Sequence, residues 1–278
     1  MFVPIGFMSP QGGGGGGFDV TLGGTLSVSL HWDFTDSSTM TLSGTDLTDI
    51  TDKVGSETLV LRPTQYNGTP APATFASDKT IFTGTGIYYK ADNWIPDSMK
   101  SDVDFSVVHF ALNDFDALAA SRIVGPWGLI GTRVDGKGHN NLRPTQFTPG
   151  YDPYSQPSCL TGTYYFSAQR FQSGWTGTKQ RFVQAVAQAD KNMCTYIYNV
   201  TGAPQNLSVT LNNNTLCTIS DTISTSYQGA GAGFNIGGRD VDYNGNWYGY
   251  MYHTIVYPFV LSQTNIDDLY ASWVAFNA

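Results

Sequence analysis

Short runs of apolar residues recur along most of this chain, and many of them alternate apolar with polar positions. Alternation with a period of two predicts half-buried β-strands, and the Gly, Asn, Asp and Pro residues between the runs predict tight turns. About a dozen such strands favours two packed antiparallel sheets. The predicted strands span residues 25–34, 57–63, 80–89, 104–112, 123–132, 163–171, 181–189, 194–200, 207–213, 215–219, 231–238 and 247–257.

Helical patterns are rare, and the clearest one lies at the C-terminal end, over residues 261–276. Ser262 is a plausible N-cap, because its side chain can accept a hydrogen bond from a free N–H of the first turn. A short helical turn is also predicted over residues 113–122. One face of the C-terminal helix is expected to carry Ile266, Leu269, Tyr270 and Trp273.

Length and composition allow one or two domains, and one large β domain fits them. The chain has 278 residues, of which 41% are hydrophobic and only 13% are charged. A chain of this length and composition can bury a sizeable apolar core. The net charge of −8 and the pI near 4.7 argue against nucleic acid and against an anionic membrane surface as partners. No apolar run approaches the roughly 20 residues of a membrane-spanning helix, so no membrane insertion is expected.

The N-terminal region has a different composition from the rest. A run of glycines, Gly12 to Gly17, separates a short apolar segment from the predicted strands. We expect residues 1–24 to form an extended anchoring arm on a partner or neighbouring subunit, and residues 25–278 to form the folded domain. A disordered tail is the alternative. The contacts of the arm are expected from Phe2, Val3, Ile5 and Phe7.

The chain start lacks the basic and apolar regions of a secretory signal, which leads us to expect synthesis and folding in a reducing cytoplasm. Three dispersed cysteines, Cys159, Cys194 and Cys217, are too few for a disulfide framework or a zinc cluster. Cys194 and Cys217 lie in apolar runs and are expected to be small buried residues.

Three stretches together resemble the concanavalin A-like lectin/glucanase superfamily, particularly its laminin G-like branch. Residues 30–61 are similar to the opening of such domains in bacteriophage structural proteins, with a Trp-Asp strand and an Asp-Lys-x-Gly turn. Residues 207–219 resemble the Asn-rich hairpin of the family, and residues 233–273 its closing unit, an Ile-Gly-Gly turn, an alternating strand and a terminal helix. The resemblance implies a lectin-like jelly roll in a virion.

The sequence therefore predicts an all-β, antiparallel jelly-roll β-sandwich of concanavalin A type with an N-terminal arm and a short C-terminal helix. The predicted function is that of a non-catalytic virion protein, as a capsid decoration, head-fibre or tail-associated protein. Its expected partners are other virion proteins, further copies of this chain, and host-surface glycans. A free-standing lectin and a polysaccharide-degrading enzyme are the alternatives.

An enzyme is disfavoured because glycoside hydrolysis generally needs two carboxylates flanking the bond. The glucanase branch places these two carboxylates in a Glu-x-Asp-x-Glu arrangement, whereas this chain has one glutamate, Glu57. The aspartate pairs Asp102/Asp104 and Asp114/Asp116 flank a predicted strand and are expected to cap turns. None of the four histidines has His-x-x-x-His metal spacing, so each is expected to be structural and no cofactor is predicted.

A calcium site is one hypothesis for the loop over residues 239–247. Asp240, Asp242 and Asn244 fit the first half of a calcium loop, in which alternate oxygen atoms converge on the ion. The position of the bidentate glutamate is Met251, which excludes an EF-hand. The alternative is a plain hairpin turn at Asn244-Gly245.

Glycan binding is the other site hypothesis. Sugar recognition uses aromatic faces together with planar hydrogen-bonding groups, and several aromatic residues lie in apparent loops. The candidates are Trp247, Trp175 and Tyr151. The alternative is that these side chains fill the core and rim of the sandwich.

Overall fold

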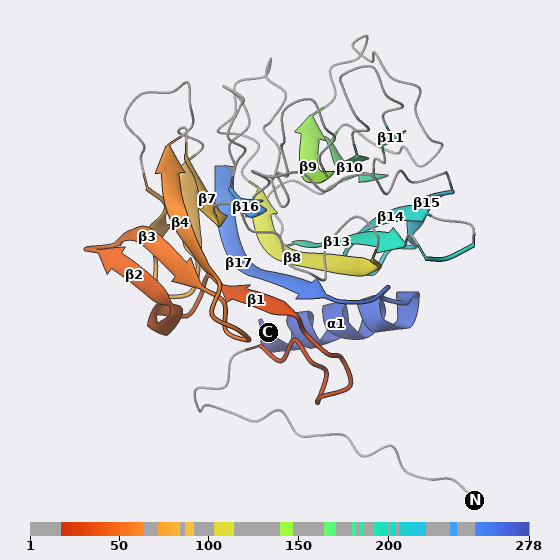
Figure 1. Cartoon of the computed structure of the whole chain (residues 1–278), viewed down its shortest axis with the longest axis horizontal. Coiled ribbons are helices and arrows are strands. Elements are labelled where there is room, and N and C mark those ends of the chain that lie inside the picture. The colour runs from red at the N-terminus through yellow and green to blue at the C-terminus, as the bar shows by residue number, and fades with distance from the viewer. Residues whose placement is uncertain are drawn as a thin grey trace, which may run out of the picture.

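Figure 1 shows a computed structural model of the chain, in which the described residues form strands, one 3-10 turn and one 14-residue α-helix. Among these residues no helix is long and apolar enough to cross a membrane. The described residues are 18–63, 72–83, 87–91, 103–113, 140–146, 164–170, 180–181, 184–185, 192–199, 201–203, 206–220, 234–237 and 248–277.

All the strand pairs are antiparallel, as expected for a jelly roll. A 13-stranded sheet has the order β15-β14-β13-β8-β17-β6-β5-β3-β4-β7-β16, with β1 paired to β17 and β2 to β3. Its strands are β1 (Leu30–Asp33), β2 (Met40–Ser43), β3 (Asp46–Thr51), β4 (Thr58–Pro63), β5 (Thr74–Phe75), β6 (Thr80–Thr83), β7 (Ile87–Ala91), β8 (Phe105–Asn113), β13 (Asn192–Asn199), β14 (Asn206–Leu211), β15 (Cys217–Ser220), β16 (Phe234–Ile236) and β17 (Tyr248–Tyr257).

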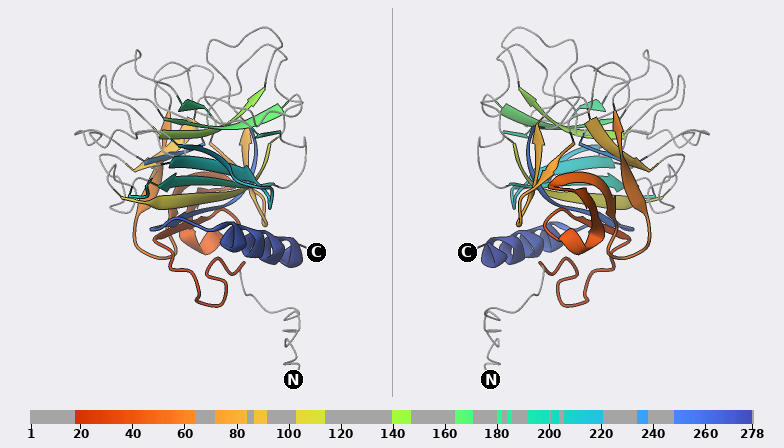
Figure 2. Two further views of the ribbon diagram at one scale, coloured as in Figure 1. Left: turned by 90° about the vertical axis from the view of Figure 1, so that its right-hand side faces the viewer. Right: turned by 90° about the vertical axis from the view of Figure 1, so that its left-hand side faces the viewer.

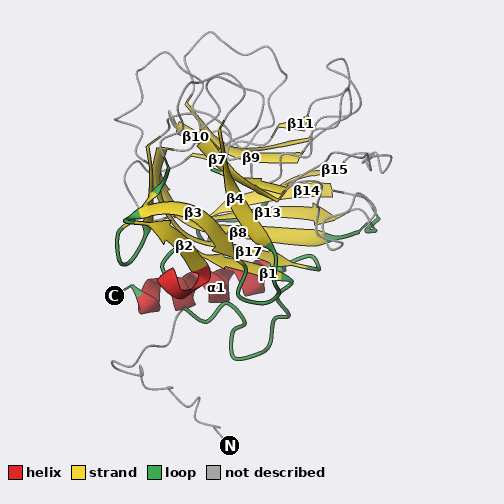
Figure 3. Cartoon of the chain, turned by 60° about the vertical axis from the view of Figure 1, so that its left-hand side comes forward, coloured by secondary structure: helices red, strands yellow, loops and turns green. Residues whose placement is uncertain are grey.

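A second, 4-stranded sheet is formed by β9 (Asn140–Gln146), β10 (Tyr164–Arg170), β11 (Gln180–Arg181) and β12 (Gln184–Ala185). It lies on the side of the molecule opposite the helix α1 (Gln263–Phe276) in both side views of Figure 2. A single 3-10 turn, η1 (Ser37–Thr39), connects β1 to β2. Figure 3 shows how completely strands dominate the described part of the molecule.

The structure confirms most of the predicted strands. The alternating or continuously apolar runs at residues 57–63, 104–112, 194–200 and 247–257 correspond closely to β4, β8, β13 and β17. The prediction missed β2, β3, β5 and β9. In β3, the polar residues Asp46, Thr48 and Asp49 obscure the alternation. The predicted strand at 123–132 and the helical turn over 113–122 lie outside the described residues, apart from Asn113 at the end of β8.

The core of the sheet is buried on both faces around β17, β8 and β13. On one face, Ile255, Val108 and Met193 belong to an apolar cluster that α1 covers, and we call this the helix face. On the other face, Val256, Val107 and Tyr196 are equally buried. This two-sided burial explains why β17 reads as nearly continuous apolar and aromatic sequence.

Residues 18–26 also pack against the helix face. Phe18, Val20 and Leu26 are buried in the same cluster, and the Tyr257 hydroxyl donates to the backbone oxygen of Val20 at 2.9 Å. Residues 18–24, which the sequence assigned to the arm, therefore contribute two side chains to the core. Phe2, Val3, Ile5 and Phe7 lie outside the described residues.

The helix α1 begins as predicted at the N-cap Ser262. Its hydroxyl accepts from the backbone N–H of Asn265, and the Asn265 side chain accepts from the backbone N–H of Ser262, which forms a capping box. The predicted face is also confirmed, because the residues buried against the sheet are Ile266, Leu269 and Trp273, with Tyr270 partly buried.

The Ile-Gly-Gly turn has a steric cause. Gly237 follows β16 with φ of +86°, and a Cβ atom there would lie 2.4 Å from the ring of Phe82. Both the backbone conformation and the neighbouring ring therefore require glycine at this position.

Candidate functional site

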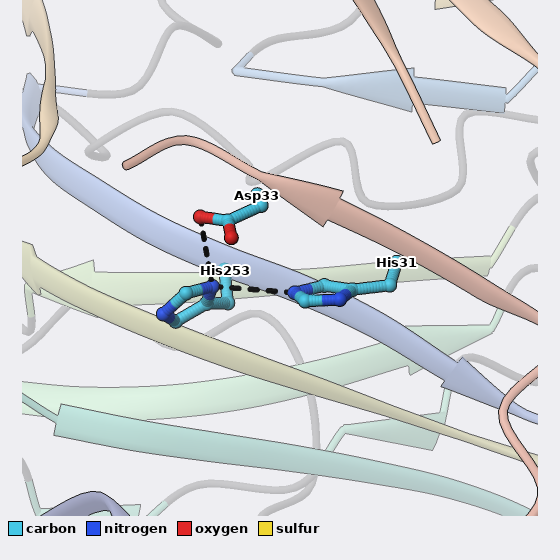
Figure 4. Close-up of side chains that lie close together, drawn as sticks. All are labelled: His31, Asp33 and His253. Carbon is cyan, nitrogen blue, oxygen red and sulfur yellow. Dashed lines mark hydrogen bonds and ion pairs between the residues drawn. The ribbon is translucent and has the colours of Figure 1, made fainter. Parts of the chain in front are cut away.

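Three side chains able to bind a proton or a metal ion meet on the helix face, and we call them the His–Asp–His cluster: His31, Asp33 and His253. His31 and Asp33 alternate along β1 and so point to the same face. In the antiparallel register Asp33 lies directly opposite His253 on β17, and cross-strand partners bring their side chains together. Figure 4 shows His253 joined by dashed lines to both Asp33 and His31.

A β-bulge in β17 places His253 on this face. The register of β17 against β8 shifts between Met251, which pairs with Ala111, and His253, which pairs with Phe110. Without the extra residue His253 would share the face of Met251, on the other side of the sheet. The bulge thus re-aims the imidazole toward Asp33, a use that bulges often have.

The polar atoms of the cluster are close to one another. The Nδ1 atom of His253 lies 3.2 Å from Oδ1 of Asp33 and 3.3 Å from Nε2 of His31. A carboxylate only accepts, so we assign the hydrogen on Nδ1 of His253 as the donor to Asp33, with the lone pair of His31 beside it. All three residues are buried, with exposed fractions of 5%, 2% and 1% for His31, Asp33 and His253.

Groups around the cluster hold the carboxylate in place. Thr35 donates to Oδ1 of Asp33 from its backbone N–H at 3.0 Å and from its hydroxyl at 2.6 Å. Lys53 lies 3.0 Å from Oδ2 of Asp33 and 2.9 Å from Oδ2 of Asp36. Asp52 accepts from the backbone N–H of His31 at 2.8 Å, which fixes β1 against the turn that carries Lys53.

Aromatic rings enclose the outer side of His253. The ring centroids of Phe18, Trp273 and Phe110 lie 5.4, 5.6 and 6.0 Å from that of the imidazole. Within this enclosure Nε2 of His253 is buried and has no hydrogen-bond partner among the described residues. A buried nitrogen without a partner costs free energy.

The surroundings set the charges of the cluster. Burial lowers the pKa of His31 to about 3, with His253 as the second cause, so His31 is neutral near pH 7. Burial alone would raise the pKa of Asp33. The hydrogen bonds from His253 and Thr35 outweigh it and hold that pKa well below its usual range. An ionised carboxylate therefore faces two imidazoles.

The geometry does not match a nucleophilic triad in the described part of the chain, because no hydroxyl or thiol is hydrogen-bonded to Nε2 of His253. The arrangement can hold a proton between Asp33 and His253, or present two nitrogens and one oxygen to a cation. Sequence reasoning missed the cluster, since His31 and His253 are 222 positions apart and neither has a recognisable local motif.

The other sequence-predicted sites lie outside the described residues. This applies to the calcium candidates Asp240, Asp242 and Asn244 and to the glycan candidates Trp247, Trp175 and Tyr151. Both sites stay predictions. Cys194 is buried, as predicted, and burial raises the pKa of its thiol.

Several described carboxylates cap turns. Asp52 accepts from the backbone N–H groups of Val54 and Gly55, and Asp104 accepts from that of Thr201, as the sequence predicted for it. A hydrogen bond from Ser38 lowers the pKa of Asp36. A general acid in glycoside hydrolysis instead needs a raised pKa.

No protein-family model matches the chain, and no curated protein is similar to it in sequence. Solved structures do match in fold. Domain 4 of AbnA, a GH43 extracellular arabinanase from Geobacillus stearothermophilus solved in complex with arabinotriose, is 11% identical, with a TM-score of 0.55, over 88% of this chain and 98% of that chain.

Two further structures match at similar levels. A GH54 α-L-arabinofuranosidase is 10% identical with a TM-score of 0.56, over 93% of this chain and 64% of that one. A receptor binding domain is 10% identical with a TM-score of 0.52, over 88% of this chain and 51% of that one. The fold is a lectin-like antiparallel β-sandwich. This confirms the predicted fold class, and identities this low support the fold alone.

Proposed function

We propose that this chain is a non-catalytic glycan-binding protein that is displayed on a bacteriophage particle. The observation that carries the glycan part is the likeness to domain 4 of AbnA, which extends over nearly all of that domain and which was solved with an oligosaccharide bound. The proposal transfers the ligand class, a neutral oligosaccharide, and not the identity of the sugar.

The carboxylates support a binding role over hydrolysis. Glu57 is the one glutamate of the chain, so the Glu-x-Asp-x-Glu arrangement of the glucanase branch cannot form. The described carboxylates with altered pKa values, Asp19, Asp33 and Asp36, are all shifted downward. Such groups are ionised at neutral pH and are unsuited to protonating a leaving group.

The virion part of the proposal rests on the sequence. The glycine run before the folded domain and the resemblance of residues 30–61 to phage structural proteins support an arm that anchors the domain to a particle. Further copies of this chain and other virion proteins are the proposed partners of the arm. The domain would then face outward toward host-surface glycans.

Glycan binding is tested with a glycan array that includes arabinotriose, followed by titration calorimetry of each hit. We expect binding to at least one oligosaccharide without release of reducing ends. Trp247→Ala or Trp175→Ala should weaken binding by about tenfold or more, because a stacked aromatic face contributes roughly 0.5–1.5 kcal/mol beyond its buried area. Tyr151→Ala is the third variant of the set.

Phe276→Ala is the matched control, since Phe276 is a 51% exposed aromatic residue at the end of α1 and is no part of the proposed site. Its affinity should equal that of the unmodified protein. An array without hits would refute glycan binding, unchanged affinity in all three variants would refute the proposed residues, and hydrolysis of a bound oligosaccharide would refute the non-catalytic role.

The location of this chain on a particle is tested by immunogold labelling or reconstruction of intact virions whose genome encodes the chain. Label on the capsid indicates a decoration role, and label on the tail indicates host attachment. If the chain is on no particle, the virion part of the proposal is overturned and a free-standing lectin remains.

A further inference from the structure

We propose that the His–Asp–His cluster is a binding site for a transition-metal ion of the zinc class, which joins β1 to β17. Nε2 of His31, Nδ1 of His253 and Oδ1 of Asp33 are the proposed ligands. The proposal is independent of glycan binding, because it rests on the distances, burial and surroundings of described residues.

The donor spacing fits a tetrahedral ion. Zinc bonds to imidazole nitrogen and carboxylate oxygen are about 2.0–2.2 Å long, so neighbouring ligand atoms in a tetrahedron lie about 3.3–3.5 Å apart. Nδ1 of His253 lies 3.3 Å from Nε2 of His31 and 3.2 Å from Oδ1 of Asp33. The candidate ligand atoms of the three residues all lie within 4.8 Å of one another, so small side-chain movements suffice to admit an ion.

The unpartnered nitrogen of His253 is a second, independent observation. With its hydrogen on Nδ1, His253 leaves Nε2 buried without a partner among the described residues. An ion on Nδ1 requires the other tautomer, in which Nε2 carries the hydrogen. An N–H group beside the rings of Phe18, Phe110 and Trp273 can donate weakly to an aromatic face, which a bare nitrogen cannot do.

The charges near the cluster admit a cation. Asp33 and Asp36 each carry one negative charge and Lys53 one positive charge, so these three groups sum to −1. Lys53 contacts the carboxylate oxygen Oδ2 of Asp33, while Oδ1 lies beside His253 and accepts the hydrogen bonds from Thr35. The side chains of Lys53 and Asp36, which lie next to the buried cluster, are 31% and 33% exposed, so solvent reaches these neighbouring groups.

The ligand set selects the class of metal. Imidazole nitrogen suits zinc, cobalt and nickel, whereas calcium and magnesium prefer oxygen ligands. Three protein ligands leave a fourth position for water. The hydrogen bonds from Thr35 to Asp33 and from His31 to Asp52 hold two of the ligands in position, as outer contacts do in metal sites.

The first test uses the full chain without an affinity tag, stripped of metal with a chelator. Titration with Co²⁺ should give one bound ion per chain and the intense visible absorption of tetrahedral cobalt. Zn²⁺ should displace the cobalt and raise the Tm by about 5–10 °C at a free concentration 100 times its Kd, while Ca²⁺ should do neither.

Variants locate the site. His31→Gln and His253→Gln remove one nitrogen ligand each and should weaken Zn²⁺ binding at least 100-fold, because loss of an outer contact alone costs 10–100-fold. His109→Gln is the matched control. His109 is also buried, but its Nδ1 atom lies 2.9 Å from the Thr254 hydroxyl on the other face of the sheet. Its affinity for zinc should be unchanged.

Circular dichroism in chelator shows whether each variant is folded. If a variant does not fold, the metal titration of the unmodified chain still tests the proposal. The proposal is overturned if the unmodified chain does not bind Co²⁺ and Zn²⁺ with a Kd below about 10 µM. Tight binding that persists in both folded histidine variants overturns it as well, since the ion would then lie elsewhere.

Discussion

The environment of individual residues decides the chemistry of the His–Asp–His cluster. Asp33 would be costly to bury alone, and its burial is offset by Thr35, Lys53 and His253. His31 is buried as a neutral imidazole, because desolvation lowers its pKa to about 3. The cluster therefore couples folding to pH.

His31 should make the fold sensitive to acid. The unfolded chain protonates His31 near pH 6.5, whereas the folded chain does so only near 3, so between these values the unfolded state binds more protons. The contribution of neutral His31 to the free energy of unfolding is therefore fully present above the pKa that His31 has in the unfolded chain. It is lost as the pH falls from about 6.5 to 3, by at most about 1.4 kcal/mol per pH unit.

Urea unfolding at intervals between pH 7 and pH 4, in chelator, measures this effect. His31→Gln should show a smaller loss of stability toward pH 4 than the unmodified protein, while Thr264→Ala, at an exposed position on α1, should keep the full loss. If His31→Gln and the unmodified protein have the same pH dependence, the protonation of His31 does not limit stability.

At the scale of elements, β17 is the central member of the described sheet. It pairs with β1, β6 and β8, and its bulge brings His253 to the helix face. The connection from β17 to α1 is fixed by Ser106 on β8, whose hydroxyl donates to the backbone oxygen of Phe259 and accepts from the N–H of Leu261. These contacts set where α1 begins.

The capping box of α1 should contribute measurably to stability. Ser262→Ala removes the acceptor for the N–H of Asn265 and should lower the free energy of unfolding by about 1 kcal/mol. Thr264→Ala, in the same turn, is the control and should change it by less than about 0.5 kcal/mol. Chemical denaturation measures both, and equal effects would show that the cap contributes nothing specific.

At the scale of the molecule, segments from both ends of the described chain close the same core. Phe18 contacts Trp273 and Phe276 of α1, with ring centroids 5.4 and 6.0 Å apart. Residues 18–26 and α1 thus cover the His–Asp–His cluster together. A test of the arm by N-terminal truncation must therefore separate the effect of deleting the glycine run from the effect of deleting the core residues that follow it.

Two truncations make that distinction. Removing residues 1–16 should leave the Tm within about 2 °C of the full chain and abolish incorporation into particles. Removing residues 1–24 also deletes Phe18 and Val20, whose burial contributes about 1.5–3 kcal/mol each, and should lower the Tm by roughly 5–15 °C. Thermal unfolding and particle assembly are the measurements. If the variant that lacks residues 1–16 is still incorporated into particles, the anchoring arm is refuted.

The sequence alone determined the fold class, most strand positions and the capped C-terminal helix. These features are local: short apolar runs between polar turns set β8 and β13, and Ser262 with the apolar residues of α1 defines the helix. The steric need for Gly237 was not readable, because the ring of Phe82 that enforces it belongs to a distant strand.

Only the tertiary structure decided the His–Asp–His cluster. Its members come from two strands separated by almost the whole chain, and the pairing of β1 with β17 brings them into register. A single bulged residue then selects the face on which His253 lies. A bulge normally interrupts the alternation of its strand, but β17 is buried on both faces, so its sequence has no alternation in which the shift could be read.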